Sequence, residues 1–188
     1  MEPPKHPLRL PCLRENAVPF KIDGAYCRLI PLNRGLYAIV DATDYERLIP
    51  WRWYARKNKR GGYYVGRNGS HQLGEPDCIL MHREILGLTR GDGLTGDHIR
   101  TGETLDNRRK NLRIATYSQN GANSRLPKNN TSGFKGVNKH ARSGLWRSRV
   151  NINGREITTY HKTKEEAYAH RRLSSAEHFG EFARDTKG

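Results

Sequence analysis

Asp97 and His98 are the neighbouring residues of this chain whose side chains best suit hydrolytic chemistry. A carboxylate is a ligand for a hard divalent cation, and an imidazole accepts a proton near neutral pH. Side by side, the imidazole suits the deprotonation of water, and a cation held by the carboxylate would offset the charge that builds up on an attacked phosphodiester. Because adjacent strand residues point to opposite faces, we expect either a twisted strand end or two side chains that meet the substrate from two sides.

Two further segments are expected to complete the site around this pair. Glycines separate short predicted strands near residues 95–99 and 111–114. A helix is predicted to begin after Thr116, because Thr116 and Gln119 form a capping box. This start places Asn120 in the first helical turn. The sequence therefore predicts a hairpin that is followed at once by a short helix.

About thirty residues, GDHIRTGETLDNRRKNLRIATYSQNGANSR, resemble the HNH family of nucleases, within the wider His-Me finger or ββα-metal group. The most similar members are of the phage and homing type, with Asp-His, then Asp-Asn-Arg-x-x-Asn-Leu-Arg, then Thr-x-x-Gln-Asn. The resemblance implies that His98 is the general base and that Asn111 braces the hairpin and orients His98. It also implies that Asp97 and Asn120 bind the metal. The third family position, often His, is Asn120 here, and such hard oxygen donors favour Mg²⁺ or Mn²⁺ over Zn²⁺.

Other polar positions nearby have non-catalytic interpretations. Asp106 and Asn107 are interpreted as a pair that tightens the loop rather than as ligands, because such side chains bond their own turn backbone. Asn123 is left open between the helix surface and a supporting place at the site. His82 is expected to pack or to contact phosphate rather than to act as a second base.

The segment 131–183 has the pattern of a separate small domain. Strands are predicted at 134–139, 145–152 and 155–160, with Asn153-Gly154 as a hairpin signal between the last two. A second capping box, Thr163 with Glu166, opens a helix that Gly180 ends. The predicted packing face of this helix consists of Ala169, Leu173, Ala176 and Phe179.

The middle strand of this domain alternates between two kinds of residue. One set is expected to face the helix: Trp146, Ser148 and Val150. Arginine reads guanine and asparagine reads adenine in the major groove, and further basic residues suit phosphate contacts. The alternative is that these are solvated strand charges. The residues predicted to bind DNA are Lys135, Lys139, Arg147, Arg149, Asn151 and Arg155.

The same segment resembles the APETALA-type DNA-binding domain of plant ethylene-response factors, which also occurs fused to HNH nucleases in phages. The matching parts are SGFKGV at 132–137, Trp146 before a charged strand, TKEEA at 163–167 and FGEFA at 179–183. The resemblance implies that a three-stranded sheet lies in the DNA major groove with the helix behind it. One part departs from the family: its Leu-Gly-x-Phe after the third strand is Thr-Thr-Tyr-His at 158–161 here, a difference that affects the packing at that corner and the contacts of the third strand.

The segment 19–87 is interpreted as β-rich, with hairpins around Asn33-Arg34-Gly35 and Gly61-Gly62, helical turns at 44–49 and a short helix at 79–86. Three roles are left open for it: a second DNA grip, a dimer surface, or support for the nuclease hairpin. A phosphate contact is favoured by four basic residues near the second turn, Arg56, Lys57, Lys59 and Arg60.

Composition favours a polyanionic partner. The formal net charge is +15, and residues 124–188 hold 14 Lys and Arg against 6 Asp and Glu. Cys12, Cys27 and Cys78 lack zinc-ribbon spacing and are interpreted as buried, inert thiols in a reducing compartment. Because no apolar run has the length of a membrane span or a secretory signal, we expect an intracellular, cytoplasmic protein, in the host cell if it is phage-encoded.

Together these features predict an α+β protein. Its expected parts are a flexible lead-in (1–18), a β-rich segment (19–87), an HNH module (88–123), a linker (124–130), an APETALA-type domain (131–183) and a tail (184–188). The predicted function is metal-dependent, homing-endonuclease-like cleavage of double-stranded DNA at a preferred site. The alternatives are a DNA-binding regulator with an inactive nuclease module and an RNA-binding protein. No protein partner is predicted, and monomer and homodimer both stay open.

Overall fold

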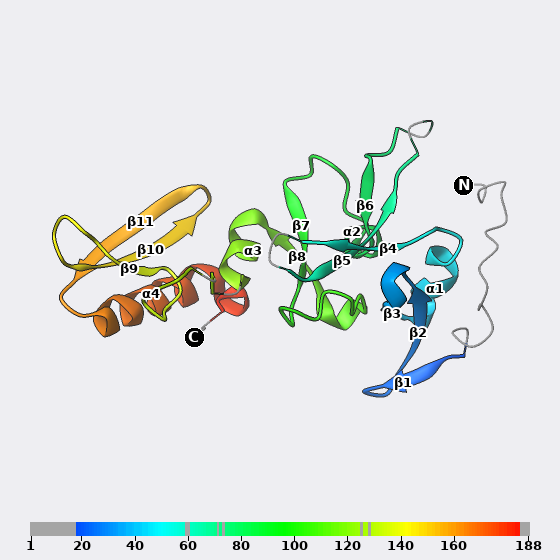
Figure 1. Ribbon diagram of the computed structural model, residues 1–188, viewed down its shortest axis with the longest axis horizontal. Helices are drawn as coiled ribbons and strands as arrows, with labels where there is room; N and C mark the ends of the chain where they lie inside the picture. The colour runs from blue at the N-terminus through cyan, green and yellow to red at the C-terminus, as the bar shows by residue number, and fades with distance from the viewer. Residues whose placement is uncertain are drawn as a thin grey trace. The chain divides into compact units, whose positions relative to one another are not determined.

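The computed structural model describes residues 18–58, 61–70, 72, 74–124, 126–127 and 129–184 (Figure 1). The predicted lead-in up to residue 17, the basic residues Lys59 and Arg60, and the tail from residue 185 lie outside the described residues. Contacts divide the chain into two units. The first comprises Met1–Asp92 and Gly96–Ile114, and the second comprises Gly93–Thr95 and Ala115–Gly188.

A three-stranded antiparallel sheet opens the first unit. It consists of β1 (Phe20–Ile22), β2 (Ala25–Pro31) and β3 (Tyr37–Asp41), with β2 in the centre. The predicted turn between the last two strands is confirmed as a short 3-10 turn, Asn33–Gly35, in which Arg34 has a φ of 63°. Helix α1 (Ala42–Leu48) follows at once and covers the predicted helical turns.

A second antiparallel sheet of the first unit has the order β4-β5-β6, with β4 (Tyr54–Lys57), β5 (Tyr63–Asn68) and β6 (Cys78–Leu80). Helix α2 (Met81–Leu86) ends as predicted at Gly87, which has a φ of 69°. The prediction that helix begins at residue 79 is wrong. Residues 78–80 pair with β5, because strand pairing satisfies their backbone groups before the helix begins.

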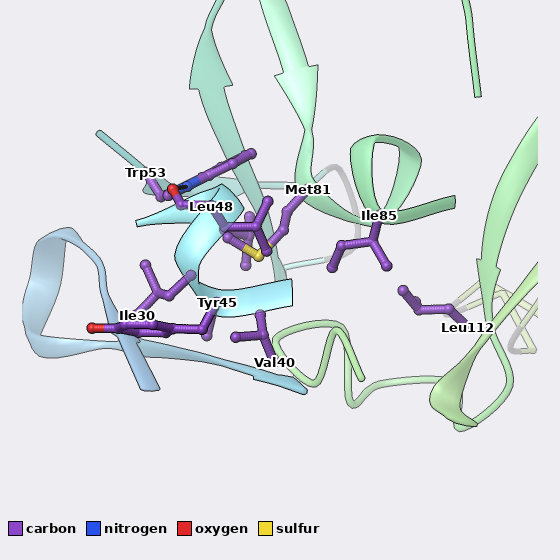
Figure 2. Packing of buried hydrophobic residues seen from close by; sticks show 10 residues of the cluster. Ile30, Val40, Tyr45, Leu48, Trp53, Met81, Ile85 and Leu112 are labelled. Carbon is purple, nitrogen blue, oxygen red and sulfur yellow. Dashed lines mark hydrogen bonds between the residues drawn. The ribbon is translucent and has the colours of Figure 1, made fainter. Parts of the chain in front are cut away.

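The core of the first unit lies where both sheets and their helices meet (Figure 2). Leu48 of α1 and Met81 of α2 have no exposed surface, and Ile85 is 3% exposed. The Trp53 indole N–H donates to the Leu48 carbonyl oxygen at 2.8 Å, which satisfies its polar group inside the core. Leu112, from the segment that carries the predicted site, packs into the same cluster. The site is therefore anchored to the main core.

The predicted site segment has the expected order of strand, strand and helix. Strands β7 (Leu94–His98) and β8 (Leu112–Thr116) form a two-stranded sheet. A 3-10 turn (Arg109–Asn111) precedes β8, and α3 (Tyr117–Asn123) follows it. The capping box of Thr116 and Gln119 is confirmed, because each side chain bonds the backbone N–H of the other residue.

The C-terminal part has the predicted sheet and helix. Strand β10 (Trp146–Ile152) pairs on both sides, with β9 (Val137–Lys139) and β11 (Arg155–His161), and all pairs are antiparallel (Figure 1). Asn153 and Gly154 have φ values of 50° and 83°, so the predicted hairpin turn is confirmed. Helix α4 (Lys164–Phe179) begins at the predicted capping box, and a short 3-10 turn (Gly180–Phe182) follows it.

The predicted packing face of α4 is wrong except at Phe179. Leu173 is 72% exposed, and both predicted alanines are exposed as well. The face that packs on the sheet consists of Ala167, Tyr168, Arg171, Ser175 and Phe179. Tyr168 decides this rotation, because its ring stacks on Phe134 with 4.3 Å between centroids.

Two further expectations concern the thiols and membranes. Cys27 and Cys78 are free thiols, of which Cys27 is buried and Cys78 is half-buried, while Cys12 lies outside the described residues. Within the described part of the chain, no helix combines the length and the apolar character that a membrane crossing requires.

Candidate active site

Asp97 and His98 lie at the end of β7, and each is only 5% exposed. The Asp97 carboxylate accepts a hydrogen bond from Arg113 Nε on β8 at 3.0 Å. Arg113 is itself largely buried, with 12% of its side chain exposed. The ion pair therefore balances the charge of Asp97 in a place where an isolated carboxylate is costly.

The His98 imidazole lies among two other rings, those of Tyr64 and His82. The His82 ring meets it edge-on with 5.0 Å between centroids, and the Tyr64 ring centroid is 6.0 Å away. Burial lowers the pKa of His98, while a hydrogen bond with Asn107 and the charge of Asp97 partly oppose this effect. His98 is therefore neutral at pH 7, as a residue that accepts a proton must be.

His82 packs against His98 and is 4% exposed. Of the two roles expected for it, packing or a phosphate contact, the structure supports packing. Its Nδ1 is buried and has no hydrogen-bond partner among the residues that the structure describes. Gly96 makes room for this ring, because a Cβ there would lie 2.5 Å from His82 Cδ2. Burial, together with the charge of His98, lowers the pKa of His82 to about 3.

The neutral, buried state of His82 predicts a dependence of stability on pH. Between pH 6.5 and about 3 the unfolded chain binds a proton at His82 that the folded chain does not bind. The free energy of unfolding therefore falls as the pH drops through this window, by at most about 1.4 kcal/mol per pH unit from this group. Urea titrations between pH 7 and 5 should show a smaller slope for His82→Phe than for the wild type. Equal slopes would contradict this account.

Asn111 ties together the two ends of the loop between β7 and β8. Its Oδ1 accepts from the Arg100 backbone N–H at 2.9 Å, and its Nδ2 donates to the Asp106 carbonyl oxygen at 2.9 Å. The Asn111 carbonyl oxygen also accepts from the Ile99 N–H at 2.9 Å. These bonds constrain the backbone directly after His98, and Asn111 is 2% exposed.

The Asp106-Asn107 pair tightens the loop as expected. The Asp106 carboxylate accepts from the backbone N–H of Arg108 at 3.2 Å and from its guanidinium Nε at 2.8 Å. All three residues are buried, with exposed fractions of 5% or less. Asn107 also reaches His98, so the loop contributes directly to the surroundings of the imidazole.

The N-terminal sheet holds this loop from the other side. Ile39 of β3 donates its N–H to the Leu105 carbonyl oxygen at 3.0 Å, and its own carbonyl accepts from the Asn107 N–H at 2.8 Å. The loop therefore adds a parallel bridge to the edge of β3. The sequence leaves three roles open for the N-terminal segment, and these contacts favour one of them, the support of the hairpin of β7 and β8.

Acidic residues of the N-terminal segment also pair with Arg109 and Lys110 of the basic run Arg108-Arg109-Lys110: Asp44 on α1 and Asp23 in the turn between β1 and β2. Asp44 accepts from the Arg109 guanidinium at 2.8 and 2.9 Å, and Asp23 pairs with Lys110. Burial opposes ionisation of Asp44, but hydrogen bonds from Arg109 and Arg47 outweigh it and lower the pKa of this carboxyl. This basic run serves the fold, since its charges are balanced by carboxylates of the same chain.

The two predicted metal ligands offer hard oxygen donors. Asp97 supplies a carboxylate on β7, and Asn120 supplies an amide oxygen from the first half of α3, where it is half-buried. In the described ranges, no three His, Cys, Asp or Glu side chains gather as a metal cluster. Carboxylate and amide oxygens are each suited to Mg²⁺ or Mn²⁺, which keep several waters, better than to Zn²⁺.

Comparison with known proteins finds relatives of this chain. A protein of Acanthamoeba polyphaga mimivirus described as an uncharacterized HNH endonuclease is 32% identical over 175 residues, which cover 89% of this chain and 84% of that protein. This chain belongs to the HNH endonuclease family. Protein 3.8 of Escherichia phage T7 is 34% identical over 88 residues, covering 47% of this chain and 72% of that protein. No protein-family model and no solved structure matches the chain.

Sequence reasoning missed two residues that this HNH endonuclease places at the site. Arg113 pairs with Asp97, and Tyr64 lies beside His98. The signal for Arg113 was present, because an arginine on the second strand of a hairpin can reach a carboxylate on the first. Tyr64 had no such signal, since it comes from a different sheet and is far from His98 in sequence.

In the C-terminal sheet of the HNH endonuclease, three predicted DNA-binding residues share one face. Arg147, Arg149 and Asn151 alternate along β10 with side chains that pack toward α4. Ser148 and Val150, on the packed face, are 2% and 6% exposed, while Arg149 and Asn151 are exposed. The predicted alternation of the middle strand is therefore confirmed, although Arg149 also pairs with Glu156 at 3.5 Å.

The other three predicted DNA-binding residues lie elsewhere. Lys135 is 8% exposed, and its ammonium group donates to the carbonyl oxygens of Gly121, Ala122 and Ser124 at the end of α3. This use as a helix C-terminal cap differs from the expected phosphate contact. Lys139 pairs in register with Trp146, and Arg155 pairs with Ile152, so both stand on the packed face of the sheet at strand ends.

A cavity of about 650 Å³ also lies in the second unit. Its walls come from α3, from the segment after it, from β9 and β10, from α4, and from the turn at Gly154. None of the four predicted catalytic and metal-binding residues is among its described lining residues, so it is separate from the candidate active site.

Proposed function

We propose that this HNH endonuclease is a metal-dependent DNA endonuclease that hydrolyses phosphodiester bonds with His98 as general base. The observation that carries the proposal is the pair of Asp97 and His98, buried side by side at the end of β7. Asn111 and the N-terminal sheet constrain the loop that directly follows this pair. The mimivirus relative, whose description is an HNH endonuclease, supports the same chemistry.

In this mechanism His98 accepts a proton from water. The water oxygen then attacks phosphorus, the bond from phosphorus to the 3′-oxygen breaks, and that oxygen takes a proton from solvent. The products are a 5′-phosphate and a 3′-hydroxyl. Neutral His98 suits this step, and the rigid loop after it keeps the imidazole in one orientation.

Asp97 and Asn120 are the residues that would hold a divalent cation, and Arg113 orients the Asp97 carboxylate. When bound, Mg²⁺ or Mn²⁺ supplies positive charge to the phosphate oxygens and the departing 3′-oxygen.

The C-terminal sheet is proposed to anchor the enzyme on duplex DNA in the manner of an APETALA-type domain. Arg147, Arg149 and Asn151 lie together on its outer face, which is the face free of α4. Arginine and asparagine are suited to base edges in the major groove. Lys139 and Arg155, at strand ends, are proposed to reach the flanking phosphates.

A plasmid-nicking assay tests the proposal. Supercoiled DNA should convert to the open-circular or linear form with Mg²⁺ or Mn²⁺, and EDTA in excess should stop the conversion. A purified protein that binds DNA but leaves the plasmid intact under all metal conditions would instead indicate a regulator with an inactive nuclease module. Preferential binding of duplex RNA over duplex DNA in competition would indicate an RNA-binding protein.

A further inference from the structure

Most cations of the segment 97–113 are paired with carboxylates of this chain. The pairs are Arg100 with Glu103, Arg108 with Asp106, Arg109 with Asp44, Lys110 with Asp23, and Arg113 with Asp97. Each DNA phosphate carries a negative charge, and a cation that already has a carboxylate partner balances it poorly. An exposed cation of the first unit that has no carboxylate partner is therefore better placed to balance a backbone phosphate near His98.

Strand β4 carries such a cation, Arg56, next to Tyr64, whose ring lies beside His98. In the antiparallel pair of β4 and β5, Arg56 stands directly opposite Tyr64, and directly opposed residues share a face of the sheet. The Tyr64 ring centroid is 6.0 Å from that of His98. The next pair along, Ala55 with Val65, stands on the other face and is buried in the core. Arg56 thus lies on the side of the sheet where the imidazole lies (Figure 1 shows the two strands side by side).

The surface around Arg56 is open and carries hydrogen-bond donors. Arg56 is exposed, and within the described part of the chain no carboxylate forms an ion pair with it. Tyr54, two residues earlier on the same face, stands opposite Gly66, and the space over this glycine is filled by Cys78 Sγ and the Leu80 side chain. The Tyr54 hydroxyl reaches over Gly66 toward Cys78 Sγ at 3.6 Å. An exposed guanidinium on a sheet face that also carries tyrosines is suited to a sugar-phosphate backbone.

We propose that Arg56 binds a backbone phosphate that flanks the scissile bond, so that the face of β4 and β5 with Tyr54, Arg56 and Tyr64 positions the cleaved DNA strand against His98. This inference rests on the proposed endonuclease function. It assigns the N-terminal segment a DNA contact in addition to its support of the loop.

The chain contains a matched control for this contact. Lys57 is the next residue on β4, is also exposed and has the same charge, but it pairs with Tyr63 and so stands on the opposite face. The full-length His98→Ala protein, which is expected not to cleave DNA, serves as the parent for three variants: Arg56→Ala, Arg56→Lys and Lys57→Ala. For each protein, binding to a fluorescent random-sequence duplex is measured at several salt concentrations. Losing one phosphate contact lowers the slope of log K against log salt by about 0.9.

For Arg56→Ala we expect the magnitude of the slope of log K against log salt to fall by about 0.9. For Lys57→Ala and Arg56→Lys we expect the same slope as for the His98→Ala parent. In the active enzyme, Arg56→Ala should raise KM about fivefold and leave kcat nearly unchanged, as expected for a lost uniform binding contact. Equal slopes for the two alanine variants overturn the inference. Because the slopes are measured without cleavage, this failure is distinct from that of the proposed function, which shows as a wild type that does not cut.

Discussion

Replacement of His98 by alanine is expected to lower the rate of DNA strand cleavage by about 10²–10⁴-fold, the usual contribution of a positioned general base. The reason is that His98 is neutral, held among Tyr64 and His82, and followed by a loop that Asn111 constrains. DNA affinity should stay close to that of the wild type, because a residue that is 5% exposed offers little contact area. Single-turnover cleavage with Mg²⁺ and anisotropy binding measure the two quantities.

Two controls separate a lost base from a damaged fold. Thermal denaturation shows whether His98→Ala remains folded, and added imidazole should restore part of the cleavage by entering the space that the side chain leaves. His178→Ala, which removes an exposed histidine of α4, should cut at the wild-type rate. A His98→Ala protein that cuts DNA as fast as the wild type would remove His98 from its proposed role.

Asp97→Asn is expected to lower cleavage by about 10²–10³-fold at a fixed Mg²⁺ concentration, as the loss of one group that stabilises developing charge does. Asparagine keeps the shape of the side chain and can still accept the hydrogen bond from Arg113 Nε, which spans 3.0 Å in the wild type. The variant therefore changes charge with less damage than alanine, which would leave Arg113 buried without its carboxylate. Titration with Mg²⁺ should show a higher concentration for half-maximal rate.

Asp92→Asn is the matched control, because Asp92 pairs with Arg83 at 3.5 Å and is not a candidate ligand. It should keep the wild-type dependence on Mg²⁺. The ligand assignment of Asp97 fails if Asp97→Asn and Asp92→Asn respond to Mg²⁺ in the same way.

Local structure was largely predictable from the sequence, because its causes are local. Thr116 with Gln119 and Thr163 with Glu166 are capping boxes whose partners lie three residues apart, and both form. The Asn153-Gly154 turn has the positive φ values that these residues tolerate best. The Asp106 side chain bonds the backbone two residues later, so its role was also visible in the sequence.

Packing faces were predictable only in part. Alternation along β10 identified its two faces, since a strand has only two and their polarity differs. The face of α4 was mistaken, because small and apolar residues occur on more than one side of that helix. Contact with the sheet selects the side of Tyr168 and leaves Leu173 exposed.

The residue pair Asp97 and His98, with which the chemistry begins, was determined by the sequence alone, as was the loop that Asn111 closes. The tertiary structure decided what surrounds them. Arg113 balances Asp97, and His82 and Tyr64 enclose His98. Carboxylates of the N-terminal segment pair with Arg109 and Lys110. These contacts join residues far apart in the chain, and the burial that lowers the pKa of His98 exists only when they are assembled. A sequence motif can therefore name the reacting groups, but the folded surroundings set their charge and orientation.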